Sequence, residues 1–267
     1  MKALILAAGK GTRLKDLTRN CPKPMLPVQG KPLLERIVCW LQRHGITQIA
    51  MNLHHCPDAI TDHFGDGQRL GVEIVYSYEA TLLGTAGAAK RLAPFLDEPF
   101  VVVYGDVFTN LNLTRLMAAH QHHRRLESRD TIATLSLYPV PNPTECGLVE
   151  LDEAGRVTRF VEKPPPDQVF TDLANAGVMV CEPEILRFIP KETSFDFGHN
   201  VFPALLTAGK TLWGQAISRD EYLIDIGTPR AYQRVQRLNL HTDGEPHSQS
   251  PEHDMVRNDH YQDAFTH

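Results

Sequence analysis

The chain has 267 residues, enough for one large or two small domains with a substantial core. Hydrophobic residues make up 42% and charged residues 22%, as in soluble globular proteins, and no apolar run reaches the roughly 18 residues of a membrane helix. Residues 241–267 hold six acids and one base, which leaves 26 acids and 26 bases in residues 1–240. This neutral body predicts no long-range attraction to nucleic acid or anionic membranes. Five scattered cysteines without a CxxC pair indicate a reduced, cytoplasmic protein.

Apolar strand-like runs alternate with amphipathic helical segments over the first part of the chain. The run FVVVYGD at 100–106 is apolar on both faces, as in a buried parallel strand. This alternation predicts an α/β fold, a Rossmann-like, doubly wound mixed sheet. We expect strands over 2–8, 48–53, 72–78 and 100–106, and helices over 32–45, over 57–64 and from 84.

The pattern changes after residue 130, where short strands come close together with turn residues between them. They predict an added, partly antiparallel portion around the far side of a pocket, still within one domain over residues 1–240. The polar, aperiodic segment 241–267 is expected to be a disordered or loosely docked tail, with metal binding by its five histidines as the alternative. The later strands are expected at 131–138, 147–152, 156–163 and 175–181, and helices at 198–209 and 228–241.

A glycine-containing loop follows the first predicted strand. Gly9 and Gly11 lack Cβ atoms, so backbone N–H groups of this loop can approach a phosphate. The dinucleotide-binding fingerprint would need a third glycine where Leu14 stands, and the P-loop would need a GK[ST] ending. The loop therefore predicts phosphate binding of another kind.

Two cations accompany this loop. Arg13 lies on it, and Lys23 follows ten residues later between Pro22 and Pro24. Each proline fixes its own φ and restricts its predecessor, so the lysine is presented on a stiff segment. An arginine fork and a rigidly held ammonium suit a triphosphate that loses pyrophosphate.

Two aspartates follow apolar runs further along the chain. Asp106 ends the run 100–106, where a carboxylate meets the crevice at the carboxyl edge of a parallel sheet. A lone buried carboxylate there is costly, which favours a metal or a cationic partner. Asp225 follows Leu223 and Ile224 in a similar setting, with capping of the helix at Thr228 as the alternative role.

The pattern GxGTRL…LT…PKPM resembles the signature of the NDP-sugar pyrophosphorylases, a family that includes glucose-1-phosphate thymidylyltransferases and mannose-1-phosphate guanylyltransferases. The resemblance extends to about residue 240, because six further blocks match in order. These blocks are EATLLGTAGA (79–88), YGD (104–106), ECGLVELD (145–152), VEKP (161–164), ANAGVMV (174–180) and LIDIGTP (223–229).

The resemblance implies that the chain joins a nucleoside triphosphate and a sugar 1-phosphate into an NDP-sugar, with Mg²⁺ as cofactor and possible assembly as a homo-oligomer. It implies direct displacement at the α-phosphorus without a covalent enzyme intermediate. The catalytic residues would be Arg13, Lys23 and Asp106, and Mg²⁺ would lie on Asp106 and Asp225. The nucleotide would contact Ala8, Gly9, Gly11, Thr12, Glu79, Gly84 and Thr85. The sugar phosphate would contact Gly147, Glu162, Lys163, Asn175 and Gly177.

The choice of nucleotide rests on Glu79, which the resemblance places at the base edge. A carboxylate offers only acceptors, which suits the adjacent N1–H and N2–H₂ donors of guanine. The sequence therefore favours GTP with a mannose- or heptose-type sugar 1-phosphate. UTP, dTTP and a contact of Glu79 with ribose or solvent remain open. A silent NDP-sugar-binding regulatory subunit would lack Arg13, Lys23 or an aspartate, and a cytidylyltransferase for another alcohol phosphate would lack the EKP and NAGV blocks.

Overall fold

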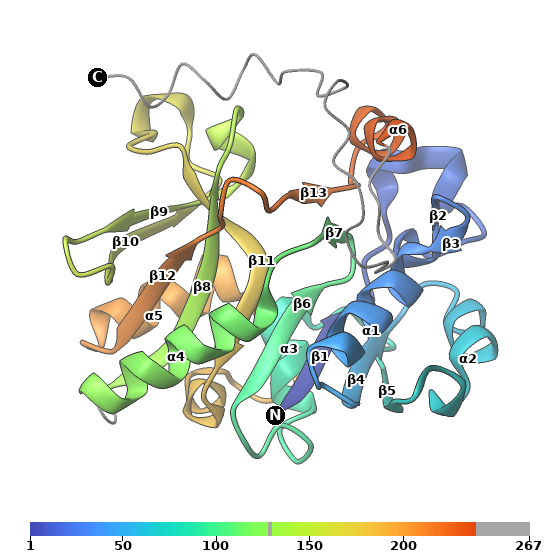
Figure 1. Ribbon diagram of the computed structural model, residues 1–267, viewed down its shortest axis with the longest axis horizontal. Coiled ribbons are helices and arrows are strands. Elements are labelled where there is room, and N and C mark those ends of the chain that lie inside the picture. The colour runs from blue at the N-terminus through green and yellow to red at the C-terminus, as the bar shows by residue number, and fades with distance from the viewer. Residues whose placement is uncertain (128–129, 239–267) are drawn as a thin grey trace, which may run out of the picture.

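The computed structural model describes residues 1–127 and 130–238, and its centre is one mixed, nine-stranded β-sheet (Figure 1). Seven strands follow the order β10-β9-β11-β6-β1-β4-β5, while β8 pairs with β11 and β12 pairs with β8. The strands of the first half are β1 (Lys2–Leu6), β4 (Gln48–Leu53), β5 (Glu73–Tyr78) and β6 (Phe100–Tyr104). Those of the second half are β8 (Thr131–Pro139), β9 (Gly147–Leu151), β10 (Val157–Glu162), β11 (Leu173–Cys181) and β12 (Thr211–Ala216).

The first half of the chain is doubly wound. Strand β1 is parallel to β4 and β6, and β4 is parallel to β5. Alternate residues of one strand serve opposite faces: Ile5 packs with the helix α1 cluster, whereas Leu4 packs with α3. The helices of this half are α1 (Leu33–Arg43), α2 (Asp58–Phe64) and α3 (Gly84–Arg91).

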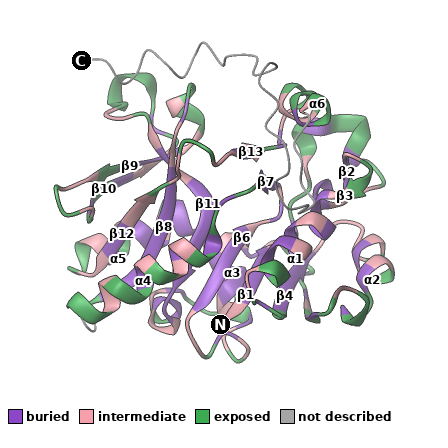
Figure 2. Ribbon diagram, in the orientation of Figure 1, coloured by how far each residue is buried: buried purple, intermediate pink, exposed green. Residues whose placement is uncertain are grey.

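The second half extends the same sheet with mostly antiparallel pairs, while β12 runs parallel to β8. Strand β11 runs antiparallel to β6, β8 and β9, and β9 runs antiparallel to β10. The remaining helices are α4 (Leu113–Glu127), α5 (Phe202–Thr207) and α6 (Pro229–Arg237), with α4 and α5 on opposite faces of the sheet (Figure 1). The buried residues concentrate in the sheet and on the inward faces of the helices (Figure 2). The predicted mixed α/β sheet with a partly antiparallel addition is confirmed.

Several elements differ from those expected. The strand expected over 100–106 ends at Tyr104, and the helix expected over 198–209 is a π-helical turn (Phe197–Val201) followed by α5. Helix α4, strand β12 and two small sheets were not anticipated. These sheets are β2 (Pro27–Val28) with β3 (Lys31–Pro32), and β7 (Val107–Thr109) with β13 (Leu223–Asp225).

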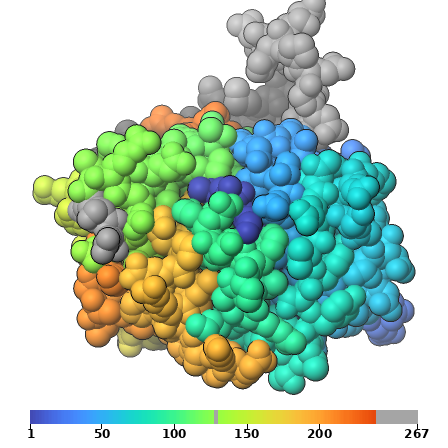
Figure 3. Space-filling model, turned by 90° about the horizontal axis from the view of Figure 1, so that it is seen from below, coloured from blue at the N-terminus to red at the C-terminus, as the bar shows by residue number. Residues whose placement is uncertain are grey.

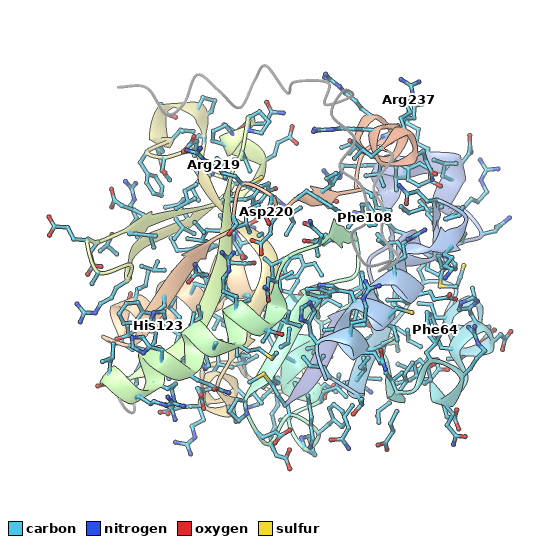
Figure 4. The ribbon with its side chains drawn as sticks, in the orientation of Figure 1. Phe64, Phe108, His123, Arg219, Asp220 and Arg237 are labelled. Carbon is cyan, nitrogen blue, oxygen red and sulfur yellow. The ribbon has the colours of Figure 1, made fainter. Side chains whose placement is uncertain are left out.

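The β7–β13 pair joins two segments that lie far apart in the sequence, residues 107–109 and 223–225. Phe108 of β7 packs against Tyr222, with 5.4 Å between ring centroids, and the Asn110 side chain donates to the backbone carbonyl of Asp220. Phe108 and Asp220 mark this junction in Figure 4. The pairing brings Asp225 opposite Val107, next to Asp106.

The chain start lies at the edge where β1 and β6 begin, surrounded by later segments in the view from below (Figure 3). The carboxyl ends of the parallel strands therefore point to the opposite side of the molecule. Within the described residues, no helix combines the length and apolar character needed to cross a membrane. The expected tail over 241–267 lies outside the described residues.

Candidate active site

The carboxyl ends of the parallel strands place three sequence-predicted segments at one edge of the sheet. The glycine loop (Ala8–Arg13) follows β1, Glu79 follows β5 and Asp106 follows β6. The N–H of Gly105 donates to the Leu6 carbonyl at 3.0 Å, so the β1 and β6 ends stay paired up to the aspartate. Side chains far apart in sequence meet here because parallel strands end at the same edge.

The glycine loop folds back onto Lys23. Gly11 has φ +62°, and a Cβ there would lie 2.9 Å from the Lys23 Cβ. Only glycine combines this left-handed backbone with so close an approach. The Thr18 hydroxyl donates to the Gly11 carbonyl at 2.9 Å and holds the turn. Gly9 and Thr12 are exposed, so the outer side of the loop is accessible to a ligand.

Lys23 binds both predicted metal-ligand aspartates. Its Nζ lies 2.5 Å from Asp106 Oδ2 and 3.2 Å from Asp225 Oδ1, although the lysine itself is only 6% exposed. The flanking prolines hold Lys23 at the start of a short 3₁₀ turn, as the sequence indicated. Partial desolvation and the facing Asp106 carboxylate raise the pKa of Asp225, and the Lys23 ammonium opposes this rise.

Arg13 completes this group of charges around Gly227. A Cβ at Gly227 would lie 2.8 Å from Lys23 Nζ and 3.0 Å from the Arg13 guanidinium. Arg13 is exposed and makes no hydrogen bond or ion pair with any residue in 1–127 or 130–238. Its fork is therefore available to an anion. Thr228, and not Asp225, caps α6, because the Thr228 hydroxyl accepts from the Ala231 N–H at 3.2 Å.

The predicted sugar-site residues of β9 and β10 lie side by side. Glu162 pairs with Gly147 across the two strands, and a Cβ at Gly147 would lie 2.5 Å from Glu162 Oε2. Lys163 Nζ lies 3.8 Å from Glu162 Oε1, and its backbone N–H donates to the Cys146 carbonyl at 2.9 Å. Burial raises the pKa of Glu162, which the nearby cations Lys163 and His199 oppose.

Asn175 and Gly177 lie on β11, where the register of its pairing with β8 shifts. The Gly177 N–H donates to Asn175 Oδ1 at 3.3 Å, and Gly177 has φ +73°. A Cβ at Gly177 would lie 3.2 Å from the Tyr104 ring, so glycine lets β11 pass this side chain. Burial raises the pKa of Tyr104, and the charge of Glu162 raises it further.

Thr85 and Gly84 contact a segment that sequence reasoning missed. Asp196 Oδ1 accepts from the Thr85 N–H at 3.0 Å and from its hydroxyl at 2.9 Å. A Cβ at Gly84 would lie 2.6 Å from the Phe195 carbonyl. Asp196 precedes Gly198, whose Cβ would overlap the Glu162 carboxylate. The only sequence signal was an acid and a glycine at the start of the predicted helix 198–209.

Cys146 lies near both groups of residues. Burial raises the pKa of the Cys146 thiol, and the charges of Asp225 and Glu162 both raise it further. The thiol is therefore within electrostatic reach of the cluster at Lys23 and of the Glu162–Lys163 pair. The combined site presents three cations, Arg13, Lys23 and Lys163, beside three carboxylates. Such a site suits phosphorylated ligands and a hard metal ion.

Comparison with known proteins identifies relatives that are named as sugar-1-phosphate nucleotidylyltransferases. The chain is 36% identical over 251 residues to a UTP–glucose-1-phosphate uridylyltransferase of Synechocystis sp., covering 89% of this chain and 63% of that protein. It is 32% identical to the D-glycero-alpha-D-manno-heptose 1-phosphate guanylyltransferase of Campylobacter jejuni, covering 87% of this chain and 97% of that protein. The chain thus spans less than two thirds of the first relative and nearly all of the second.

A solved structure repeats this architecture. The crystal structure of HddC from Yersinia pseudotuberculosis complexed with GMP-PN matches with a TM-score of 0.71 and 26% identity. The match covers 88% of this chain and 97% of that chain.

The contacts of Lys23 lead to a prediction about stability. Lys23→Met removes the ammonium that Asp106 and Asp225 share and leaves two facing carboxylates. We expect the free energy of unfolding to fall by about 1–3 kcal/mol at neutral pH, less than for a fully buried pair because Asp225 is 48% exposed. Mg²⁺ should restore stability more in this variant than in the wild type. Urea unfolding with and without Mg²⁺ measures both effects.

Lys10→Met is the matched control, because Lys10 is exposed on the same loop. Equal stability of the two variants in the absence of metal would contradict the electrostatic coupling of the three residues.

A family model shows where the whole chain belongs. The model described as nucleotidyl transferase matches residues 2–241, which include the glycine loop, the Lys23 cluster and the strands of the second half. The protein is a member of the nucleotidyl transferase family, as the motifs of its sequence predicted.

Proposed function

We propose that this protein is a sugar-1-phosphate nucleotidylyltransferase, which converts a nucleoside triphosphate and a sugar 1-phosphate into an NDP-sugar and pyrophosphate. One observation carries this proposal: Arg13, Lys23, Asp106 and Asp225 converge beside the glycine loop. The Glu162–Lys163 pair lies near this cluster, with Cys146 close to both. Such a site can neutralise two phosphorylated substrates at once. The presence of all four residues argues against a silent NDP-sugar-binding subunit.

The reaction follows from how these residues are placed. An oxygen of the sugar 1-phosphate attacks the α-phosphorus, the bond from that phosphorus to the β-phosphate oxygen breaks, and pyrophosphate leaves with the electron pair. Arg13, exposed and free of described partners, binds the departing β- and γ-phosphates, while Lys163 binds the phosphate of the sugar. Lys23 stays at the reacting centre because its segment is rigid. This displacement requires positioning and charge neutralisation and no covalent enzyme intermediate.

Asp106 and Asp225 fit a hard divalent cation. Their oxygens already bind one cationic group, the Lys23 ammonium, and carboxylate oxygens are the ligands that Mg²⁺ prefers in proteins. We infer that these two residues hold Mg²⁺, which when bound neutralises phosphate charge. With the cation in place, the Lys23 ammonium would be available to contact the α-phosphate. Like-charge repulsion between the aspartates, which raises the pKa of Asp225, favours occupation by a cation.

The second half of the sheet provides the sugar site. Glu162 and Asn175 offer hydrogen-bond acceptors and an amide donor to sugar hydroxyls. The absence of Cβ atoms at Gly147 and Gly198 leaves room for the Glu162 carboxylate, since a methyl at either position would overlap it. Gly177 lets β11 pass close to Tyr104, and its N–H donates to Asn175 Oδ1 and holds that side chain.

The nucleotide that we propose is GTP, with a manno-configured hexose or heptose 1-phosphate. Two comparisons support guanine: the heptose 1-phosphate guanylyltransferase spans nearly the same length, and the HddC structure was obtained with GMP-PN. The uridylyltransferase at 36% identity favours UTP with glucose 1-phosphate as the second candidate. A panel of GTP, UTP and dTTP against several sugar 1-phosphates, with pyrophosphate release as the readout, tests the reaction and ranks the substrates.

The first activity prediction concerns Arg13. Arg13→Ala should lower the rate of pyrophosphate release by about 100-fold or more, because a preorganised charge contact to the leaving group is lost. Arg19→Ala is the matched control, since Arg19 is exposed on the same segment and pairs with Asp16. Near wild-type turnover in purified, folded Arg13→Ala would count against the mechanism.

The second activity prediction concerns the metal. Asp106→Asn and Asp225→Asn should each abolish activity or raise the Mg²⁺ concentration needed for half-maximal rate, because an amide is a poorer ligand for a hard cation. Asp97→Asn, at an exposed ion pair with Lys2 on the opposite edge of the sheet, should leave the Mg²⁺ titration unchanged. Full wild-type activity in excess chelator would overturn the metal assignment.

A further inference from the structure

A chain of hydrogen bonds crosses the carboxyl edge of the sheet beside the charged cluster. The Ala7 N–H donates to Asn52 Oδ1 at 2.8 Å, and Asn52 Nδ2 donates to Glu79 Oε1 at 2.8 Å. The Leu83 N–H donates to Glu79 Oε2 at 2.9 Å. Asn52 is 4% exposed and Glu79 is 3% exposed, so these bonds form away from water.

This chain connects the two segments that surround the nucleotide in the proposed function. Ala7 immediately precedes the glycine loop, and Leu83 immediately precedes Gly84 at the start of α3. Asn52, near the end of β4, stands between them. Asp196 and Phe195 hold the other side of the α3 segment. Among the hydrogen bonds of the described residues, those of Asn52 and Glu79 connect this segment to Ala7, at the end of β1.

Both oxygens of the Glu79 carboxylate are engaged inside the protein. Its backbone is equally constrained, because the Glu79 N–H donates to the Leu53 carbonyl at 2.8 Å and His54 Nδ1 donates to the Glu79 carbonyl at 2.7 Å. A side chain with both oxygens bound and 3% exposure is poorly placed to accept two further bonds from a base edge.

The order of donors and acceptors dictates which side chains can close this bridge. The hydrogen-bond chain begins and ends at a backbone N–H donor, that of Ala7 and that of Leu83. Each of the two side chains between them must therefore offer an acceptor to one backbone N–H, and one side chain must also donate to the other. Asparagine with glutamate meets this requirement. Glutamine at position 79 would place two donors face to face, and aspartate at position 52 would place two acceptors face to face. Aspartate at 52 with glutamine at 79 meets the requirement again.

We propose that Glu79 and Asn52 are positioning residues that set the separation between the glycine loop and the start of α3. In this role Glu79 acts through the backbone and replaces the direct contact with guanine that the sequence suggested. The inference rests on the proposed function for its effect on nucleotide binding. The discrimination between bases then belongs to backbone groups of the loop that follows Glu79.

The test is a double-mutant cycle with Glu79→Gln, Asn52→Asp and the pair combined. Each single variant should raise the KM for the nucleoside triphosphate about tenfold or more, since one buried hydrogen bond becomes a clash. The KM for the sugar 1-phosphate should stay unchanged. The double variant should recover to within about threefold of the wild type, because all three hydrogen bonds can form again. The ratio of kcat/KM for GTP and UTP should be the same in all four proteins.

Glu73→Gln is the matched control. Glu73 accepts from Gln48 at 3.3 Å across the same two strands, β4 and β5, but in an exposed position, so its loss should leave nucleotide KM unchanged. Urea unfolding of the same four proteins tests the Asn52–Glu79 hydrogen bonds independently of activity. Both single variants should have a lower free energy of unfolding than the wild type, and the double variant should recover the lost stability.

The outcomes separate the two proposals. A change of tenfold or so in the GTP-to-UTP ratio on Glu79→Gln, with no recovery in the double variant, would overturn the positioning role and assign the carboxylate to base recognition. Recovery of both the free energy of unfolding and the nucleotide KM in the double variant supports the positioning role of Asn52 and Glu79. If the wild type releases no pyrophosphate with any substrate pair, the proposed function fails, and additive unfolding free energies in the cycle would separately overturn the bridge.

Discussion

The Lys23 ammonium shared by Asp106 and Asp225 is the interaction on which the site depends. Its two partners lie 83 and 202 residues away in the sequence, so this contact forms only when the β6 end, the β7–β13 pair and the proline-flanked turn are all in place. Two facing carboxylates repel each other, and a cation must stay between them. The Lys23 ammonium meets this requirement.

The sheet supplies the two walls of the site by different means. Its parallel half ends in loops that lack side chains at critical points, as at Gly11, where a Cβ would lie 2.9 Å from the Lys23 Cβ. Its antiparallel half presents Glu162 and Lys163 from a strand end, packed against glycines that keep the carboxylate in place. Extension of one continuous sheet therefore places a second set of charges near the first.

Prediction from sequence succeeded where local pattern carries the physics. The apolar runs 48–53 and 100–106 predicted buried strands, which the structure forms over 48–53 and 100–104. The stiffness of Lys23 follows from its two prolines. Prediction failed where the structure of a segment depends on a partner that is distant in the sequence. The β7–β13 pair consists of three-residue strands without a periodic signal, and Asp196 acquires its role only by meeting Thr85, 111 residues away.

The sequence by itself determined the family, the fold class with most of the main strands, and the chemical types of residue at the site, because motifs and hydrophobic periodicity are local properties of the chain. The tertiary structure decided which of those residues meet and what each one touches. Glu79 shows the difference: its acceptors are evident in the sequence, yet only the fold places Asn52 and the Leu83 N–H against them. A hydrogen-bonding side chain takes the nearest complementary partner, and distance in the folded chain is set by packing and not by sequence separation.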